Sequence, residues 1–330
     1  MRKYDDFSLK SFNTFGLDVK TKSFVEYESP DDLLQLDFAK PYLFVGRGSN
    51  LLFTKDYEGT IVHCGITGIN IDEETDDYVD VRVGAGEIWD DFVEYAVLRG
   101  WSGLENLSLI PGEVGAAAVQ NIGAYGVEAK DVIHSVEFYH IPTKQILHKA
   151  VTELKYGYRT SIFKTDWVGQ CAICSVVFRL SKVFSPKLEY GKLKENFNDV
   201  GTISPATVRQ KVIEIRNSKL PKVEELGSAG SFFMNPIVSK EVAASLLQRY
   251  PEMPHYNQDG GVKIPAGWMI EQCGWKGKTL GRAGVYAKQA LVLVNLGDAK
   301  GEDIVKLSES IQKDVKQKFG IEIHPEVNFI

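Results

Sequence analysis

One nearly uncharged segment, residues 110–127, constrains the fold more than any other part of the chain. It contains four glycines, four alanines and a single charged residue, with the amide pair Gln120 and Asn121 in its middle. Such a segment carries too little charge for an ordinary solvated loop, and each glycine disfavours a helix by about 1 kcal/mol relative to alanine. Small residues let a backbone approach a flat or anionic ligand closely. We therefore interpret the segment as a backbone cradle for a large cofactor, with a tightly packed buried loop as the alternative.

The composition is typical of a globular protein without a basic surface. The chain has 330 residues, enough for two or three domains, and is 44% hydrophobic and 25% charged. Its net charge of −6 does not favour nucleic acid or an anionic membrane as a partner. The first residues lack the apolar core of a signal peptide, and no apolar run approaches the ~20 residues of a membrane span. We therefore expect a cytoplasmic protein.

The spacing of apolar residues predicts a mixture of strands and helices. Strand-like runs occupy residues 42–46, 60–64, 78–83, 135–141, 171–180 and 290–295, and helix-like runs occupy 88–98, 207–216, 238–250 and 302–319. Long strand-rich stretches predict an α+β fold, with a domain boundary near the polar helix within 202–218. Cys171 and Cys174 fall in one predicted strand, where side chains at this spacing point to opposite faces. We expect both to be reduced core residues, and no metal site.

A second glycine-containing loop follows the first predicted strand. Residues 46–52 read Gly-Arg-Gly-Ser-Asn-Leu-Leu, and glycines after a strand expose consecutive backbone N–H groups that suit a pyrophosphate. The loop lacks the dinucleotide fingerprint, because position 51 is leucine and no helix pattern follows. Alone it is also compatible with a plain turn. Together with the cradle, it predicts a long ligand held at two places.

Three polar residues in separate motifs are candidates for chemistry. Arg159, in Tyr-Gly-Tyr-Arg-Thr-Ser, could hold a carboxylate or phosphate in a forked pair, or lie at the surface stacked on tyrosine. Ser231 stands between a glycine turn and two phenylalanines, as a proton donor or a turn serine. Glu326 falls in the alternating run 322–327, which predicts a closing strand, and is an interior acid or a solvated one.

These motifs and others resemble one family over essentially the whole chain, the UDP-N-acetylenolpyruvoylglucosamine reductases. The shared segments are 46–52, Ile-Pro-Gly-x-x-Gly at 110–115, Gln-Asn-Ile-Gly-Ala-Tyr-Gly-Val-Glu at 120–128, Tyr-x-Tyr-Arg-x-Ser-x-Phe-Lys at 156–164, Gly-Ser-x-Gly-Ser-Phe-Phe at 227–233 and His-Pro-Glu-Val at 324–327. Residues 188–193 resemble the tyrosine loop of the family's type I branch. The order and spacing of so many segments make a chance match implausible.

The resemblance implies an FAD-binding two-domain fold of the vanillyl-alcohol oxidase (PCMH) type, followed by an α+β substrate-binding domain. The FAD-binding subdomains would cover residues 1–70, joined by the final strand 319–330, and residues 71–218; the substrate-binding domain would cover 219–318. FAD would be bound without a covalent link. The residues expected to bind it are Gly46, Arg47, Gly48, Ser49, Asn50, Leu51, Ile110, Pro111, Gly112, Gly115, Ala116, Gln120, Asn121, Gly123, Ala124, Tyr125, Gly126 and Val127.

The resemblance also implies an activity in peptidoglycan precursor synthesis. NADPH would reduce the flavin, which would pass hydride to the alkene of UDP-N-acetylglucosamine enolpyruvate and give UDP-N-acetylmuramate. Ser231 would donate the proton, while Arg159 and Glu326 would stabilise the carboxylate and the enolate-like intermediate. The residues expected to contact substrate are Tyr158, Tyr190, Lys219, Asn235 and Gln289. We expect a monomer whose partner is this small molecule.

Two other functions are compatible with parts of the pattern. A flavin oxidase of the same fold would often attach its flavin through histidine or cysteine, and neither glycine-rich loop contains either residue. An inactive flavin or nucleotide-sugar binder would have no need of Ser231, Arg159 and Glu326 together. The sequence departs from the family pattern at Met234, where we expect lysine, at Tyr286, where histidine is common, and at Ala118-Val119, which replaces a Pro-Ile pair. None of these departures touches the three candidate catalytic residues.

Overall fold

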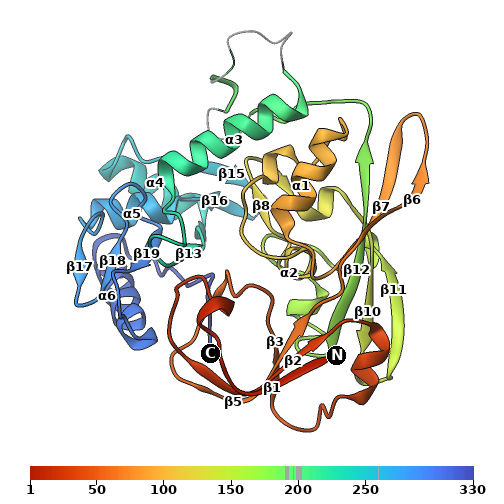
Figure 1. Ribbon diagram of the computed structural model, residues 1–330. Coiled ribbons are helices and arrows are strands. Elements are labelled where there is room, and N and C mark those ends of the chain that lie inside the picture. Colours follow the sequence, from red (N-terminus) through yellow and green to blue (C-terminus); the bar gives the residue numbers. More distant parts are fainter. Residues whose placement is uncertain (190–192, 196, 198–202, 259) are drawn as a thin grey trace. The chain divides into compact units, whose positions relative to one another are not determined.

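The computed structural model describes residues 1–189, 193–195, 197, 203–258 and 260–330, and it groups the chain into two compact units. The first unit is Met1–Phe7, Thr21–Arg47 and Glu58–Arg216, and the second is Ser8–Lys20, Gly48–Tyr57 and Asn217–Ile330. Each unit therefore gathers segments that are far apart in the sequence (Figure 1). The division into 1–70, 71–218 and 219–318 stays a prediction.

The first unit is built on two sheets. A five-stranded antiparallel sheet has the order β11-β10-β12-β7-β6, and a four-stranded sheet has the order β1-β2-β5-β3, in which β3 and β5 are parallel. The strands are β1 Arg2–Ser8, β2 Lys20–Tyr27, β3 Tyr42–Phe44, β5 Tyr57–Cys64, β6 Ile69–Glu74, β7 Tyr78–Gly84, β10 Ile133–His140, β11 Gln145–Ala150 and β12 Cys171–Ser181, with a short hairpin of β8 Gly123–Ala124 and β9 Val127–Glu128. Short 3₁₀ helices connect them at Pro30–Gln35, Glu105–Leu107, Ala129–Asp131, Val151–Glu153 and Ile162–Lys164.

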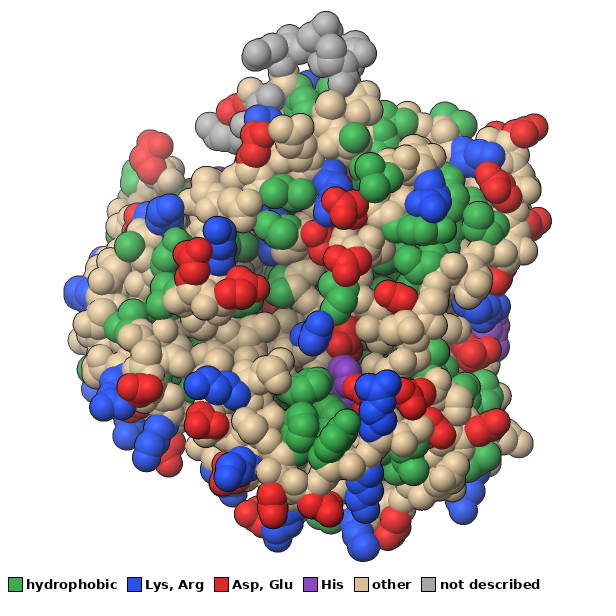
Figure 2. All heavy atoms as spheres, in the orientation of Figure 1, with side chains coloured by type: hydrophobic (Ala, Val, Ile, Leu, Met, Phe, Trp, Pro, Cys, Tyr) green, Lys and Arg blue, Asp and Glu red, His purple; other side chains and the backbone are tan. Residues whose placement is uncertain are grey.

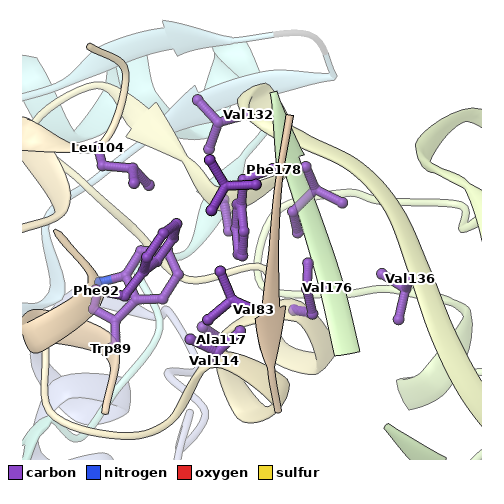
Figure 3. Close-up of a cluster of buried hydrophobic side chains, with 14 of the residues drawn as sticks. Val83, Trp89, Phe92, Leu104, Val114, Ala117, Val132, Val136, Val176 and Phe178 are labelled. Atoms are coloured by element: carbon purple, nitrogen blue, oxygen red, sulfur yellow. The ribbon is translucent and has the colours of Figure 1, made fainter. Parts of the chain in front are cut away.

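The main core of the first unit packs two helices, α1 (Trp89–Leu98) and α2 (Val114–Gln120), against the five-stranded sheet. In Figure 3, Trp89 and Phe92 of α1 pack against Phe178 of β12, and Val114 and Ala117 of α2 lie beside Val83 of β7. The ring centroids of Phe92 and Phe178 are 4.8 Å apart. Burying each such side chain contributes about 1.5–3 kcal/mol, so this core holds α1 and α2 against the sheet.

The two cysteines of β12 belong to different apolar clusters. Cys171 lies in the cluster beneath α1 and α2, and Cys174 lies in a second cluster with Tyr27 of β2 and Val62 of β5. The two side chains therefore occupy opposite faces of the sheet. Both are buried and form no disulfide, which confirms that they are core residues.

Residues 110–127, whose glycines predict a poor helix, nevertheless form one in their middle. Residues Val114–Gln120 form α2, which ends at Asn121 in the left-handed conformation (φ 51°). Packing against the sheet outweighs the low helix propensity of glycine at position 115. A side chain there would place its Cβ 2.8 Å from that of Ala85. Only glycine permits this close approach of helix and sheet, and the neighbouring alanines favour the helix.

The described residues of the second unit form three small sheets and three α-helices, together with the end of α3. The sheet orders are β13-β19-β18-β17, β14-β16-β15 and β20-β4. The strands are β4 Leu51–Leu52, β13 Ser228–Ser231, β14 Ile237–Val238, β15 Tyr256–Gln258, β16 Gly261–Lys263, β17 Thr279–Leu280, β18 Ala283–Val285, β19 Val292–Asn295 and β20 Asn328–Phe329, and the helices are α4 Lys240–Arg249, α5 Ala266–Gln272 and α6 Gly301–Phe319. A 3₁₀ helix covers Lys10–Phe12, and the helix α3 (Pro205–Lys219) contains the boundary between the units at Arg216 and Asn217.

The predicted closing strand over 322–327 is wrong. Ile321 and Ile323 do alternate with exposed neighbours, but this part of the chain forms only an isolated bridge between Pro325 and Phe233. Proline has no N–H to continue a ladder. The strand forms later, as β20, which runs parallel to β4, and the backbone N–H of Thr54 donates to the last carbonyl, that of Ile330, at 2.8 Å.

The other predicted elements are confirmed with shifts of a few residues at their ends. The run 88–98 corresponds to α1 and 302–319 to α6, which ends at Gly320 with φ 71°. On the face drawn in Figure 2, acidic and basic side chains are interspersed. None of the described helices has the length and apolarity that crossing a membrane demands.

Candidate active site

Asn121 ties the predicted cradle to the loop that carries Arg159. Its side-chain Nδ2 donates to the carbonyl of Gly157 at 2.8 Å, and its Oδ1 accepts from the backbone N–H of Lys130 at 3.0 Å. A second link runs from Ser161 Oγ to the carbonyl of Val119 at 2.7 Å. Because Asn121 and Ser161 are fully buried, these bonds replace water and hold the two motifs together.

The guanidinium of Arg159 lies on the cradle. Its Nη2 donates to the carbonyl of Gly123 at 2.5 Å, and its Nη1 donates to that of Asn121 at 3.4 Å. The backbone of Arg159 is in the left-handed region (φ 55°), and its carbonyl accepts from Lys164 Nζ at 3.1 Å. The ring of Tyr158, half exposed, lies 5.2 Å from the guanidinium carbon. The structure thus brings Arg159 and the cradle together in the first unit.

The loop that begins at Gly46 has the features of an anion-binding loop. Within the described ranges of the chain, the backbone N–H groups of Gly46 and Arg47 donate no hydrogen bond, and neither do those of the next three residues, Gly48 to Asn50, in the second unit. Gly48 cannot be replaced, because its φ is 64° and a Cβ there would lie 2.0 Å from the carbonyl of Phe12. Unpaired amides on a loop that requires glycine fit a ligand rich in acceptors, such as the diphosphate of a dinucleotide.

Sequence reasoning missed a buried ionisable group beside this loop. The side chain of Glu113, which precedes α2, is 4% exposed and lies 3.6 Å from Arg47 Nε and 3.8 Å from Nε2 of His63 on β5. Burial raises the pKa of Glu113 to about 8, Arg47 opposes the rise and Glu26 adds to it. The available signal was that Glu113 is the single charge in residues 110–127. Nothing in the sequence linked Glu113 to residues 26 and 63.

In the second unit, Ser231 and Glu326 lie on neighbouring segments of backbone. Ser231 ends β13, and the next residue, Phe232, accepts a hydrogen bond from the backbone N–H of Glu326 at 2.8 Å. The N–H of Met234 donates to the carbonyl of His324 at 2.9 Å. The two segments therefore run antiparallel, with Ser231 exposed and Glu326 half-buried.

The predicted substrate contacts have different local roles. Asn235 Oδ1 accepts from the N–H of Ala266 at 2.9 Å and so caps the start of α5. Gln289 Oε1 accepts from the N–H of Leu291 at 3.3 Å. Lys219 is exposed at the end of α3. Tyr190 lies outside the described residues.

The second unit also contains a hollow of about 850 Å³. It is lined by Lys10, Thr54–Asp56 and polar residues between Val223 and Gly227 and between Asn295 and Glu302. None of the predicted site residues lines it, and its lysines and carboxylates carry mixed charge. We therefore do not assign it to the candidate site.

Comparison with known proteins adds independent evidence. Two family models match the chain: an FAD binding domain at residues 33–148 and the C-terminal domain of UDP-N-acetylenolpyruvoylglucosamine reductase at 221–330. The reductase of that name from Bacteroides fragilis is 55% identical over 98% of this chain and 99% of its own length. That from Neisseria gonorrhoeae is 46% identical over 98% and 96%.

A solved structure shows the same fold. The UDP-N-acetylenolpyruvylglucosamine reductase of Thermus caldophilus superposes with a TM-score of 0.69 over 99% of this chain and 98% of that one, at 23% identity. Together with the two family models, this likeness confirms the predicted fold class.

Proposed function

Because the chain belongs to the UDP-N-acetylenolpyruvoylglucosamine reductase family, we propose that it reduces UDP-N-acetylglucosamine enolpyruvate to UDP-N-acetylmuramate with NADPH. The observation that carries the proposal is 55% identity over 98% of the chain to a protein with that reductase activity in its name. Family membership and the FAD binding domain make the chain an FAD-dependent oxidoreductase. The roles of individual residues are proposed below from their chemistry.

FAD would be held by the two glycine-rich loops. The unpaired N–H groups of Gly46 and Arg47 suit its diphosphate, and residues 110–127 supply an uncharged backbone for close approach. When bound, FAD supplies the redox chemistry by taking hydride from NADPH and delivering it to the terminal alkene carbon of the enolpyruvyl group. Neither loop contains histidine or cysteine, so we propose that it is held without a covalent bond.

Arg159 and Glu326 would act on the carboxylate of the substrate. An enol ether is electron-rich, and it resists hydride addition until its conjugated carboxylate is polarised. The forked guanidinium of Arg159 suits a carboxylate, and the carbonyls of Gly123 and Asn121 fix its orientation. Groups held in place before the reaction stabilise developing charge at little reorganisation cost. This is the role we assign to Arg159, whereas the family resemblance is the ground for proposing that Glu326 takes part with it.

Ser231 would supply the proton. Its hydroxyl is on the exposed end of β13, directly after Gly230, whose φ of 66° turns the chain. A serine hydroxyl is a weak acid, but it can protonate a strongly basic carbanion held in contact with it. The alternative, a flavin oxidase with another substrate, would make no use of this proton donor.

A two-step anaerobic mixing experiment tests the proposal. The purified chain, loaded with FAD, is mixed first with NADPH and then with UDP-N-acetylglucosamine enolpyruvate, while the visible absorbance of the flavin is followed. We expect bleaching with NADPH and recovery only when the enolpyruvyl sugar is added. Bleaching without recovery would identify a flavin enzyme with another acceptor. Failure to bind FAD at all would contradict the cofactor assignment itself.

A further inference from the structure

The side chain of Glu113 faces the Gly46 loop and does not cap α2, the helix that begins after it. Glu113 is the N-cap residue of α2, yet its side chain accepts no hydrogen bond from that helix. Instead, a Cβ built on Gly46 would lie 2.9 Å from Glu113 Oε2. The carboxyl group thus occupies the space that a side chain at Gly46 would fill, next to the first residue of the loop with unpaired N–H groups.

Ionisable groups from three parts of the first unit face this carboxyl. Arg47 belongs to the loop, with its side chain 48% exposed. His63 and Cys64 come from β5, and Glu26 and Tyr27 come from β2. The shortest approaches are 3.6 Å from Arg47 Nε and 3.8 Å from His63 Nε2. Both exceed hydrogen-bond length, so a charge on Glu113 would be buried with little compensation.

The tautomer of His63 follows from its surroundings. Its Nδ1 lies 2.9 Å from the carbonyl oxygen of Val45, which can only accept, so Nδ1 carries a hydrogen. The neutral ring then presents the lone pair of Nε2 to Glu113 and to Glu26, each 3.8 Å away. Burial lowers the pKa of His63 and raises that of Glu113 to about 8. Near neutral pH both groups are therefore uncharged, and the loop itself contributes the positive side chain of Arg47.

We propose that Glu113 makes binding of FAD proton-linked: the loop accepts the diphosphate while Glu113 is neutral and repels it when Glu113 ionises. A carboxylate whose Oε2 lies 2.9 Å from a Cβ built on Gly46 is well within the ~8 Å over which charges interact at physiological salt. It would also compete with the diphosphate for Arg47. The inference rests on the proposed function, because it takes FAD as the ligand of this loop.

The test is the affinity of the FAD-free chain for FAD as a function of pH, measured by quenching of flavin fluorescence. Between pH 7 and pH 9 we expect the Kd of the wild type to rise about tenfold, as required when only the protonated form binds and its pKa is about 8. Glu113→Gln keeps the shape and removes the charge, so its Kd should vary far less over this range. Parallel curves for the two proteins would overturn the inference.

A second variant changes the pKa of Glu113 without a substitution at Glu113 itself. Glu26 raises the pKa of Glu113, so Glu26→Gln should move the onset of FAD weakening to lower pH. An onset that stays at the wild-type pH would contradict the placement of the titrating group.

The wild type alone also provides a test, should a variant fail to fold. Calorimetric titration with FAD in two buffers of different ionisation enthalpy should show uptake of close to one proton at pH 9 and almost none at pH 7. FAD binding without proton uptake at pH 9 contradicts this inference alone. No binding of FAD at any pH contradicts the proposed function.

Discussion

Arg159 Nη2 donates a hydrogen bond to the carbonyl oxygen of Gly123 at 2.5 Å. The bond joins the residue proposed to hold the substrate carboxylate to the loop proposed to hold the flavin, within one unit of the fold. The position of the guanidinium is thus set by backbone atoms of the cradle.

The contact between Arg159 and Gly123 predicts the effect of adding one methyl group at position 123. In Gly123→Ala, the new Cβ would lie 2.8 Å from Arg159 Nη1 and 2.9 Å from the carbonyl oxygen of Val127, so the guanidinium and the backbone of the β8–β9 hairpin must both shift. A shift of about 1 Å can cost on the order of 10²-fold in rate, and we expect this loss in the reoxidation of reduced flavin by substrate, measured by stopped-flow absorbance. Gly157→Ala is the matched control, because its Cβ meets only a methyl group of Thr160 at 3.1 Å. Equal losses in both variants would argue against the role of Arg159.

Replacing Ser231 should separate the two half-reactions. Ser231→Ala removes the proposed proton donor from an exposed position that no core packing depends on. We expect flavin reduction by NADPH to remain nearly intact and the second half-reaction to slow by about 10²–10⁴-fold. Ser239→Ala, which removes the N-cap of α4, is a control that should lower stability by about 1 kcal/mol and leave both half-reactions unchanged. Equal slowing of both steps in Ser231→Ala would refute the assignment.

The buried Glu113 should also affect stability in the FAD-free chain. Its pKa is about 8 when folded against an ordinary value of 4.5, so between these pH values the unfolded chain releases a proton that the folded chain keeps. The contribution of Glu113 to the free energy of unfolding is largest below pH 4.5. It decreases as pH rises toward 8, by up to about 1.4 kcal/mol per pH unit. In urea unfolding at pH 5, 6.5 and 8, the free energy of unfolding of Glu113→Gln should increase relative to that of the wild type as pH rises. A constant difference would show that Glu113 is ionised in the folded chain.

The thiols should differ in reactivity. Burial raises the pKa of Cys171 and Cys174 to about 12 and that of Cys64 to about 11. Since the thiolate is the reactive form, Ellman's reagent at pH 8 should react with these residues only after denaturation. The half-exposed Cys273 should react first in the native protein, and Cys273→Ser should abolish that early phase. Rapid reaction of all four thiols would contradict the packing of β12.

The spacing of apolar residues was enough to predict those helices and strands that are determined by their own residues. In α1, Trp89, Phe92 and Val93 repeat at helical spacing, and α6 ends at Gly320. The helix α2 could not be predicted, because its stability depends on Gly115 packing against Ala85, thirty residues away. Local propensity does not contain that contact.

The candidate site was predictable where its motifs were continuous in sequence. The cradle, the Gly46 loop and the Arg159 loop are each short segments, and their glycines and amide side chains are visible in the chain itself. The cluster around Glu113 was not, because Glu26, His63 and Glu113 come from β2, β5 and the start of α2. Only the pairing of these strands brings them together.

The parallel pairing of β4 with β20 sets an order of events during synthesis. Residues 48–57 leave the ribosome early, but Thr54 hydrogen-bonds to Ile330, which is added 276 positions later. All segments of the first unit exist once Arg216 has been made, whereas β4 of the second unit has no partner until β20 has been made. At about 5–20 residues per second, making residues 217–330 takes on the order of ten seconds. During that time the growing chain exposes β4 without its partner, so a variant that lacks Asn328 and Phe329 of β20 should be less stable than the wild type.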